Sequence, residues 1–262
     1  MTPEFLFRRD MLLDTDQVQL IKLLPAARVS EFLDGRMYLN SATYFADIDD
    51  ADAVRFDADE ALTASWQVAQ LSIQNESGEW LPIGGIRGPA RVRGAGEPGL
   101  NVLCLYGLTQ REDDRFDTRN LQFGDQAIVI SNAQEFVRRL AAAAAAAGRK
   151  SGYGPIDYVD RNEFHGQMGP FRKFSGYSYQ NEFRFVTNGG DGTPYRLGIG
   201  TFATSRGSPR APRFRIFGPL VSPDKRLPAT GHNQSVVTDS SWARHFFIEP
   251  TSFSLRSSSP RF

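Results

Sequence analysis

Two polar side chains have the types and the spacing for acid/base and recognition chemistry. Gln180 and Glu182 lie two residues apart in the segment 177–186, which reads YSYQNEFRFV. If this segment is extended, alternate side chains point to opposite faces. One face then carries aromatic side chains, interrupted only by Asn181, and the other carries Gln180 and Glu182. A carboxylate beside a carboxamide on one face can reach a single ligand.

The same segment has a purely structural interpretation. An antiparallel strand with one solvent-facing side shows the same alternation. Glu182 could then simply pair with Arg184 on the polar face. The pattern therefore predicts a strand over residues 177–186 and leaves open whether its polar face binds anything.

Composition limits the classes of protein that fit this chain. The 262 residues are 40% hydrophobic, which is enough to bury a substantial core in one large domain. A single cysteine, Cys104, rules out an internal disulfide and indicates a reducing compartment. The sequence shows no signal peptide and no apolar run of membrane-spanning length. We therefore expect a soluble, cytoplasmic protein without a membrane partner.

The net charge of zero hides a difference between the two ends of the chain. Residues 1–60 contain thirteen acidic and six basic side chains, whereas residues 201–262 contain three acidic and nine basic ones. The two ends could attract each other, or the basic end could contact nucleic acid. Six excess charges over some sixty residues favour the structural explanation.

The elements that must position the polar pair follow from periodicity and turn signals. Helical spacing predicts a helix over residues 14–29 that Asp14 or Thr15 caps and Pro25 ends or kinks. A second helix begins after Ser131 or Asn132, continues through the alanine tract 141–147 and ends at Gly148. The predicted strands are residues 4–8, 37–39, 67–74, 79–83, 101–108, 126–130, 156–159, 177–186 and 195–199.

These elements predict an α+β fold, with a mostly antiparallel β-sheet core and two or three helices. Residues 1–200 form the single α+β domain in this interpretation. Residues 201–262, rich in Arg, Ser and Pro, form an extension with little regular structure that packs back on the domain.

The acidic segment 47–60 does not fit a calcium loop. With Glu60 as the twelfth ligand, Ala51 and Ala53 fall on positions that need oxygen. The segment is better explained as a loop whose acidic side chains are solvated and whose Arg55 pairs with Asp57 or Glu60.

Other common catalytic motifs are absent from the sequence. There is no Walker sequence, no GxGxxG opening a helix, no GxSxG and no HExxH. The three histidines are too few for a histidine-rich metal centre, and we predict no metal. His165, in the loop before the segment 177–186, is a reserve catalytic candidate, and Cys104 is expected in the core.

Several short motifs together carry a resemblance. They are GRMY at 35–38 with YFAD at 44–47, FGD at 123–125, and FRKF at 171–174 with YQNEFR at 179–184. In combination they resemble a widespread family of poorly characterised bacterial proteins associated with mobile elements and phage defence. Gln180 and Glu182 also resemble the Gln-x-Glu motif of ADP-ribosyltransferases.

The second resemblance implies roles for specific residues. In ADP-ribosyltransferases an arginine on the first strand holds the NAD phosphates, which matches Arg8. A Ser-Thr-Ser strand shapes the nicotinamide pocket, and Ser41 and Thr43 match it imperfectly because Ala42 replaces the central threonine. The motif glutamate, here Glu182, bonds the ribose and supports the oxocarbenium-like transition state.

The chemistry that this resemblance implies needs little covalent help from the protein. A carboxylate near the developing positive charge and aromatic walls around the nicotinamide are sufficient. Tyr38, Tyr44 and Phe45 could supply those walls. The resemblance implies that the residue at the position of Gln180 helps to choose the acceptor. A carboxamide suits an arginine side chain or a nucleobase edge, because it both donates and accepts hydrogen bonds.

Two hypotheses of different classes follow. The first is an ADP-ribosyltransferase-like fold that uses NAD as a substrate, in a toxin or phage-defence effector. Such a protein would modify a protein or nucleic-acid acceptor and could have a neutralising partner protein. The second is a non-catalytic α+β binding module in which residues 177–186 are an ordinary amphipathic strand.

Overall fold

The computed structural model describes residues 18–46, 57–68, 71–85, 88–94, 99–109, 116–201, 214–218 and 220. All of them belong to one unit of the chain, Met1–Pro223. They form a strand-rich α+β fold in which a single described pair of strands, β10 and β12, is parallel. The predicted α+β class, with a mostly antiparallel sheet and few helices, is confirmed.

The elements are labelled in chain order. The strands are β1 (Val18–Leu24), β2 (Arg36–Ser41), β3 (Ala64–Trp66), β4 (Leu71–Gln74), β5 (Trp80–Ile83), β6 (Ala90–Val92), β7 (Asn101–Thr109), β8 (Gln126–Ile130), β9 (Ser151–Pro155), β10 (Asp157–Val159), β11 (Gly166–Gln167), β12 (Arg172–Phe174), β13 (Glu182–Thr187), β14 (Tyr195–Gly198) and β15 (Phe214–Phe217). The α-helices are α1 (Val29–Leu33) and α2 (Ala133–Ala146). The 3-10 helices are η3 (Ala26–Arg28), η5 (Thr118–Phe123) and η6 (Ser175–Gln180).

The largest sheet is split along one edge of β7. Tyr106 pairs with both Ile21 of β1 and Glu182 of β13, and Val102 pairs with both Asn40 of β2 and Val186 of β13. Because a strand has two edges, β13 occupies one edge, and β1 and β2 share the other. They diverge between Val102 and Tyr106, so the middle of β7 lacks a strand partner on that side.

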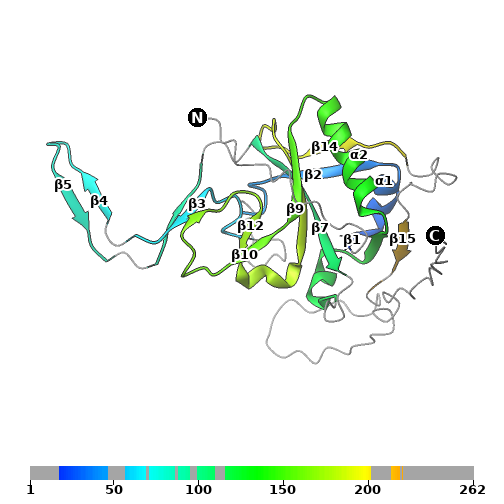
Figure 1. Cartoon of the computed structure of the whole chain (residues 1–262), viewed down its shortest axis with the longest axis horizontal. Coiled ribbons are helices and arrows are strands. Elements are labelled where there is room, and N and C mark those ends of the chain that lie inside the picture. The colour runs from blue at the N-terminus through cyan, green and yellow to red at the C-terminus, as the bar shows by residue number, and fades with distance from the viewer. Residues whose placement is uncertain are drawn as a thin grey trace, which may run out of the picture. The chain divides into compact units, whose positions relative to one another are not determined.

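Alternation along these strands gives the sheet two different faces. Leu39, Leu103, Leu105, Phe183 and Phe185 belong to the main hydrophobic core, which also contains Phe136 and Leu140 of α2. Helix α2 therefore covers this face, as Figure 1 shows. The intervening residues point to the opposite face: Asn40, Val102, Cys104, Tyr106, Glu182 and Arg184.

Helix α2 has the boundaries that the sequence predicts. The Asn132 side chain accepts a hydrogen bond from the Glu135 backbone N–H, as an N-cap does. Gly148 follows the helix with a φ of 70°, a left-handed conformation that suits glycine. Phe136, Leu140 and Ala144 are fully buried at a spacing of four residues, so one side of the helix packs on the sheet.

The helix predicted over residues 14–29 is wrong where the structure describes it. Val18–Leu24 is the strand β1, paired with β7 on one side and β8 on the other. Leu20 and Ile21, adjacent in the sequence, are both fully buried, so both faces of the strand are covered. In a strand buried on both faces, apolar side chains occupy neighbouring positions, as Leu20 and Ile21 do here, and this spacing also fits a helix.

The strand predicted over residues 177–186 is partly wrong. Residues 175–180 form the 3-10 helix η6, and the strand β13 begins at Glu182. Asn181, with a φ of 37°, ends η6 in the left-handed conformation that asparagine tolerates better than most residues. The alternation holds from Glu182 onward, but its polar face is buried rather than solvent-facing.

The other predicted strands are confirmed with small differences at their ends, apart from two. In the predicted strand 67–74, the structure has a strand only at residues 71–74, which form β4, because β3 ends at Trp66 and residues 69 and 70 lie outside the described residues. The strands β3, β6, β9, β11 and β12 were not predicted. The predicted strand 4–8 lies outside the described residues. In the predicted C-terminal extension, β15 pairs antiparallel with β8. No helix in the described part of the chain is long and apolar enough to cross a membrane.

Candidate functional site

A cavity of about 420 Å³ lies over the split in the sheet. Residues of β1, β2, β7 and β13 line it, together with residues of η3, α1, η5, β12 and η6 and with Phe45 and Asp57. Its polar lining includes Asn40, Asp57, Asn120, Lys173, Gln180, Glu182 and Arg184, and its aromatic lining includes Tyr38, Phe45, Tyr106 and Phe123. This size and this mixture of groups are typical of pockets that hold small molecules.

Arg184 is the centre of a buried ionic cluster at one end of the cavity. Its Nη1 and Nη2 donate to Glu60 Oε1 and Oε2 at 2.7 and 2.6 Å, in a bidentate pair. Its Nε donates to Glu182 Oε1 at 2.6 Å, and Nη2 also contacts Glu182 Oε2 at 3.3 Å. The Pro170 carbonyl accepts from Nη1 at 2.8 Å. All five N–H groups of the guanidinium are therefore used.

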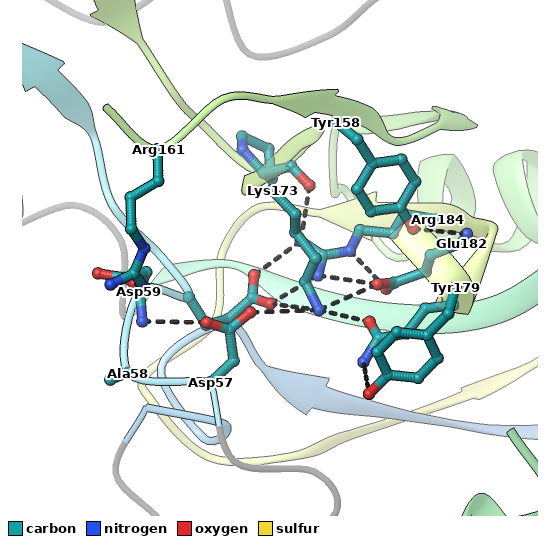
Figure 2. Close-up of polar contacts among 12 residues, drawn as sticks. Asp57, Ala58, Asp59, Tyr158, Arg161, Lys173, Tyr179, Glu182 and Arg184 are labelled. Atoms are coloured by element: carbon teal, nitrogen blue, oxygen red, sulfur yellow. Dashed lines mark hydrogen bonds and ion pairs between the residues drawn. The ribbon is translucent and has the colours of Figure 1, made fainter. Parts of the chain in front are cut away.

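Lys173 joins this cluster from β12. Its Nζ lies 3.2 Å from Glu60 Oε2, 3.2 Å from Glu182 Oε2 and 3.4 Å from Asp57 Oδ2. It also donates to Gln180 Oε1 at 2.9 Å. Figure 2 shows the ammonium group between the carboxylates of the segment 57–60 and Glu182. Lys173 thus ties Gln180 and Glu182 together.

Burial sets the energetics of this cluster. The exposed fractions are 1% for Arg184, 4% for Glu60, 6% for Glu182 and 8% for Lys173. Charged groups this deep are stable only when each has an opposite charge and hydrogen bonds. The cluster is therefore sensitive to the loss of any single member.

The segment 57–60 is fixed to the rest of the fold from its outer side. The Asp59 carboxylate pairs with Arg91 Nη1 at 2.9 Å and with Arg161. Ala61, which directly follows Glu60, has a φ of 60°, a left-handed conformation that costs a non-glycine residue roughly 1–2 kcal/mol. This unusual backbone turn coincides with the point where Glu60 meets Arg184.

The pKa values of the acidic groups in the cluster shift in different directions. Burial alone would raise the pKa of Glu182, but the charges of Arg184 and Lys173 outweigh it and hold that pKa well below its ordinary value. The same balance lowers the pKa of Glu60. Burial raises the pKa of Asp57, although Lys173 opposes it. Glu182 is consequently a carboxylate at neutral pH.

Cys104 is the thiol of this site and pairs across the sheet with Arg184. Burial, the negative charge of Glu182 and a hydrogen bond to Glu182 raise the pKa of the Cys104 thiol to about 12. A thiol with such a pKa is almost entirely protonated at neutral pH and is a poor nucleophile. Cys104 lines the cavity, but it acts there as a weak donor to Glu182.

The structure brings four of the predicted site residues together. Gln180 and Glu182 line the cavity, as do Tyr38 and Phe45 among the aromatic residues. Gln180 belongs to η6 and Glu182 to β13, so they do not share a strand, but Lys173 contacts both. Their predicted catalytic and binding roles remain predictions.

The remaining predicted residues do not line this cavity or lie outside the described residues. Ser41 is buried on the side of β2 that faces the main core, and its Oγ lies 3.5 Å from Thr43 Oγ1. Tyr44 is 39% exposed and contacts the edge of the Phe45 ring. Neither Ser41, Thr43 nor Tyr44 belongs to the cavity lining. Arg8 lies outside the described residues.

Sequence reasoning missed Glu60, Asp57 and Lys173 as members of the site. The acidic side chains of the segment 47–60 were expected to be solvated, which is wrong for Asp57 and Glu60. Arg55 lies outside the described residues, and Glu60 pairs with Arg184 and Lys173. The available signal was Lys173 between Phe171 and Phe174, since a lysine in an aromatic run needs a buried partner.

The carboxylates of the cavity lie against basic side chains. Within the described ranges, no group of three or more His, Cys, Asp or Glu side chains is placed to hold a metal ion. The carboxylates of Asp57, Glu60 and Glu182 are instead neutralised largely by Lys173 and Arg184. His165, the reserve candidate, accepts a hydrogen bond from the Gln67 backbone N–H and does not line the cavity.

Comparison with protein-family models, with curated proteins and with solved structures finds no match to this chain.

Proposed function

We propose that this protein is an NAD-dependent ADP-ribosyltransferase, acting in the cytoplasm as a toxin or phage-defence effector. The observation that carries the proposal is the convergence of Tyr38, Phe45, Gln180 and Glu182 on one cavity. Tyr38 and Phe45 belong to or follow β2, whereas Gln180 and Glu182 are some 140 residues further along the chain. The split in the largest sheet brings these segments to one cavity.

The proposed reaction is a substitution at the ribose carbon C1′ of NAD. The bond to nicotinamide breaks, and its electron pair leaves with the nicotinamide ring. The acceptor nucleophile forms the new bond to C1′ and loses a proton. Positive charge develops on the ribose, and the ionised carboxylate of Glu182 would stabilise it.

To stabilise the ribose, Glu182 must accept a hydrogen bond from it in addition to, or in place of, its present donors. Arg184 and Lys173 hold its oxygens through their N–H groups, and the Cys104 thiol supplies a further, weaker bond. A carboxylate has about four acceptor positions. A ribose hydroxyl would therefore replace the thiol, because a thiol is the weakest donor of the set.

In this proposal Gln180 meets the acceptor. Its Oε1 is held by Lys173, and its Nε2 makes only a long contact of 3.5 Å with the Tyr179 hydroxyl. The amide N–H groups can thus turn toward an acceptor side chain or a nucleobase edge. A protein or a nucleic acid could serve as acceptor, and a partner protein that covers the cavity would neutralise the activity.

A non-catalytic binding module is the second candidate. The observation that favours it is the engagement of both Glu182 oxygens by buried cations, which is also what a purely structural ionic cluster looks like. In that case the cavity would bind a ligand or a partner group without any covalent change.

Incubation with labelled NAD and cell extract distinguishes the ADP-ribosyltransferase from the non-catalytic binding module. The proposal predicts that the wild type transfers label to a macromolecule and that Glu182→Gln reduces transfer at least about a hundredfold, the usual cost of removing one transition-state contact. The matched control is Glu163→Gln, since Glu163 is exposed on the loop 160–165. Folding of each variant is checked by circular dichroism. Absence of labelling by the wild type would favour the binding module.

A further inference from the structure

Asn40 carries an unsatisfied hydrogen-bond acceptor at the cavity. Its Oδ1 is buried, and no donor reaches it among the described residues. Two other buried side-chain atoms share this property, Ser65 Oγ and Thr187 Oγ1, but neither residue lines the cavity. Asn40 is therefore the one member of this set, within the described ranges, that a ligand in the cavity could satisfy.

The position of Asn40 in the split gives this acceptor a defined neighbourhood. Asn40 pairs with Val102, so Cys104 is its diagonal neighbour on the same face of the sheet. Tyr38 stands two residues earlier on the same face of β2, and the Arg28 guanidinium lies 4.6 Å from the centre of its ring. Asn40 thus lies between an aromatic wall and the Cys104–Glu182 end of the cavity.

An unpaired acceptor beside aromatic walls selects a particular kind of ligand group. A buried carboxamide oxygen without a donor is costly, so a ligand that brings an N–H to it gains more than the bond is worth in water. The aromatic walls favour a flat ring that carries this N–H. Rotation about the last side-chain torsion lets the Asn40 amide present its oxygen to the cavity.

We infer that Asn40 is a specificity-determining residue that accepts a hydrogen bond from the carboxamide N–H of an aromatic ring. In the reaction proposed above, this ring is the nicotinamide of NAD, and the inference rests on the proposed function for that identification. Asn40 makes no covalent contribution. It discriminates between rings with an amide N–H and rings of the same shape without one.

A direct test compares NAD with its 3-acetylpyridine analogue, in which a methyl group replaces the amide NH₂ and the charge is unchanged. Dissociation constants are measured by titration calorimetry with the full chain. The wild type is expected to bind NAD about tenfold more tightly, which corresponds to ~1.4 kcal/mol. Asn40→Leu should remove this preference, whereas Asn40→Asp, which keeps an acceptor, should retain it. Asn162→Leu, at an exposed loop position, is the control.

Each outcome decides the inference. Equal affinities for the two dinucleotides in the wild type, no measurable binding of either one, or an undiminished preference in Asn40→Leu would overturn it. If Asn40→Leu does not fold, Asn40→Ala replaces it, because alanine also lacks an acceptor and leaves space rather than adding volume. Selective binding without NAD consumption would support Asn40 and overturn the proposed function. NAD consumption without selectivity would support the proposed function and overturn the role of Asn40.

Discussion

Arg184 Nε donates to Glu182 Oε1 at 2.6 Å, two residues earlier on the same strand. Both side chains are buried on the face of the sheet that borders the cavity. Glu60, more than a hundred residues earlier in the sequence, accepts hydrogen bonds from Nη1 and Nη2 of the same guanidinium. The candidate catalytic carboxylate is therefore held by a cation whose own position depends on a distant segment, and stability and activity should be coupled here.

Removing the charge of Glu60 should destabilise the fold strongly. Glu60→Gln leaves the Arg184 guanidinium buried without its bidentate partner. Breaking a buried pair in this way costs about 3–5 kcal/mol in the free energy of unfolding. Urea denaturation of the variant and of Glu163→Gln measures this. A loss below about 1 kcal/mol, the range of exposed ion pairs, would show that the cluster is not a stabilising unit.

Stability should fall in acid because of Glu60 and Glu182. Their folded-state pKa values lie below the ordinary value of 4.5. Groups of this kind stabilise the fold fully above their unfolded-state pKa, and the contribution is lost as pH falls through the folded-state pKa. Asp57, with its raised pKa, acts in the opposite sense.

The measurement is the free energy of unfolding of the wild type and of Glu182→Gln at about pH 5 and about pH 3. The wild type should lose more stability over this interval than the variant, because glutamine does not titrate. Equal losses would mean that the folded-state pKa of Glu182 is not depressed.

Cys104 should react slowly with alkylating reagents. With a pKa of about 12, its thiolate fraction near neutral pH is roughly a thousandfold below that of a free cysteine. Glu182→Gln should accelerate alkylation, since the charge of Glu182 is one cause of the raised pKa. Mass spectrometry of the intact protein measures this rate without interference, because the chain has one cysteine. A wild-type alkylation rate near that of a free thiol would show that the pKa of Cys104 is not raised.

Asn181 should tolerate glycine better than alanine. It combines a φ of 37° with a 2.6 Å hydrogen bond from its Nδ2 to the Gly107 carbonyl. Alanine loses the bond and is strained by roughly 1–2 kcal/mol in this conformation, whereas glycine loses the bond alone. Thermal unfolding should therefore rank the wild type above Asn181→Gly and Asn181→Gly above Asn181→Ala. A reversed order of the two variants would show that this backbone turn does not require left-handed geometry.

Local signals predicted the parts of the fold that local chemistry determines. The cap at Asn132, the alanine tract and Gly148 all act within one helix, and they placed α2 correctly. The helix predicted over residues 14–29 is wrong because β1 pairs with β7 and β8, strands that are distant in the sequence. Asn181 was visible as a break in the alternation, but its left-handed conformation depends on Gly107.

The candidate site was predictable only in part for the same reason. The types of Gln180 and Glu182 marked them as candidates, but their burial depends on Glu60 and Lys173. Nothing in the spacing of the segment 57–60 shows that its carboxylates meet a strand some 120 residues later. Long-range ionic contacts of this kind follow from topology, which periodicity does not determine.

The release of nicotinamide from NAD by the purified protein tests the central claim most directly. The wild type is predicted to release nicotinamide. Phe45→Ala should lower kcat/KM about tenfold or more, because stacking on an aromatic wall is worth ~1–3 kcal/mol per ring. Trp80→Ala, at an aromatic residue of β5 that is 66% exposed and outside the cavity lining, should leave the rate unchanged. No release by the wild type, or equal effects of the two substitutions, would contradict the assignment of this cavity as the NAD site.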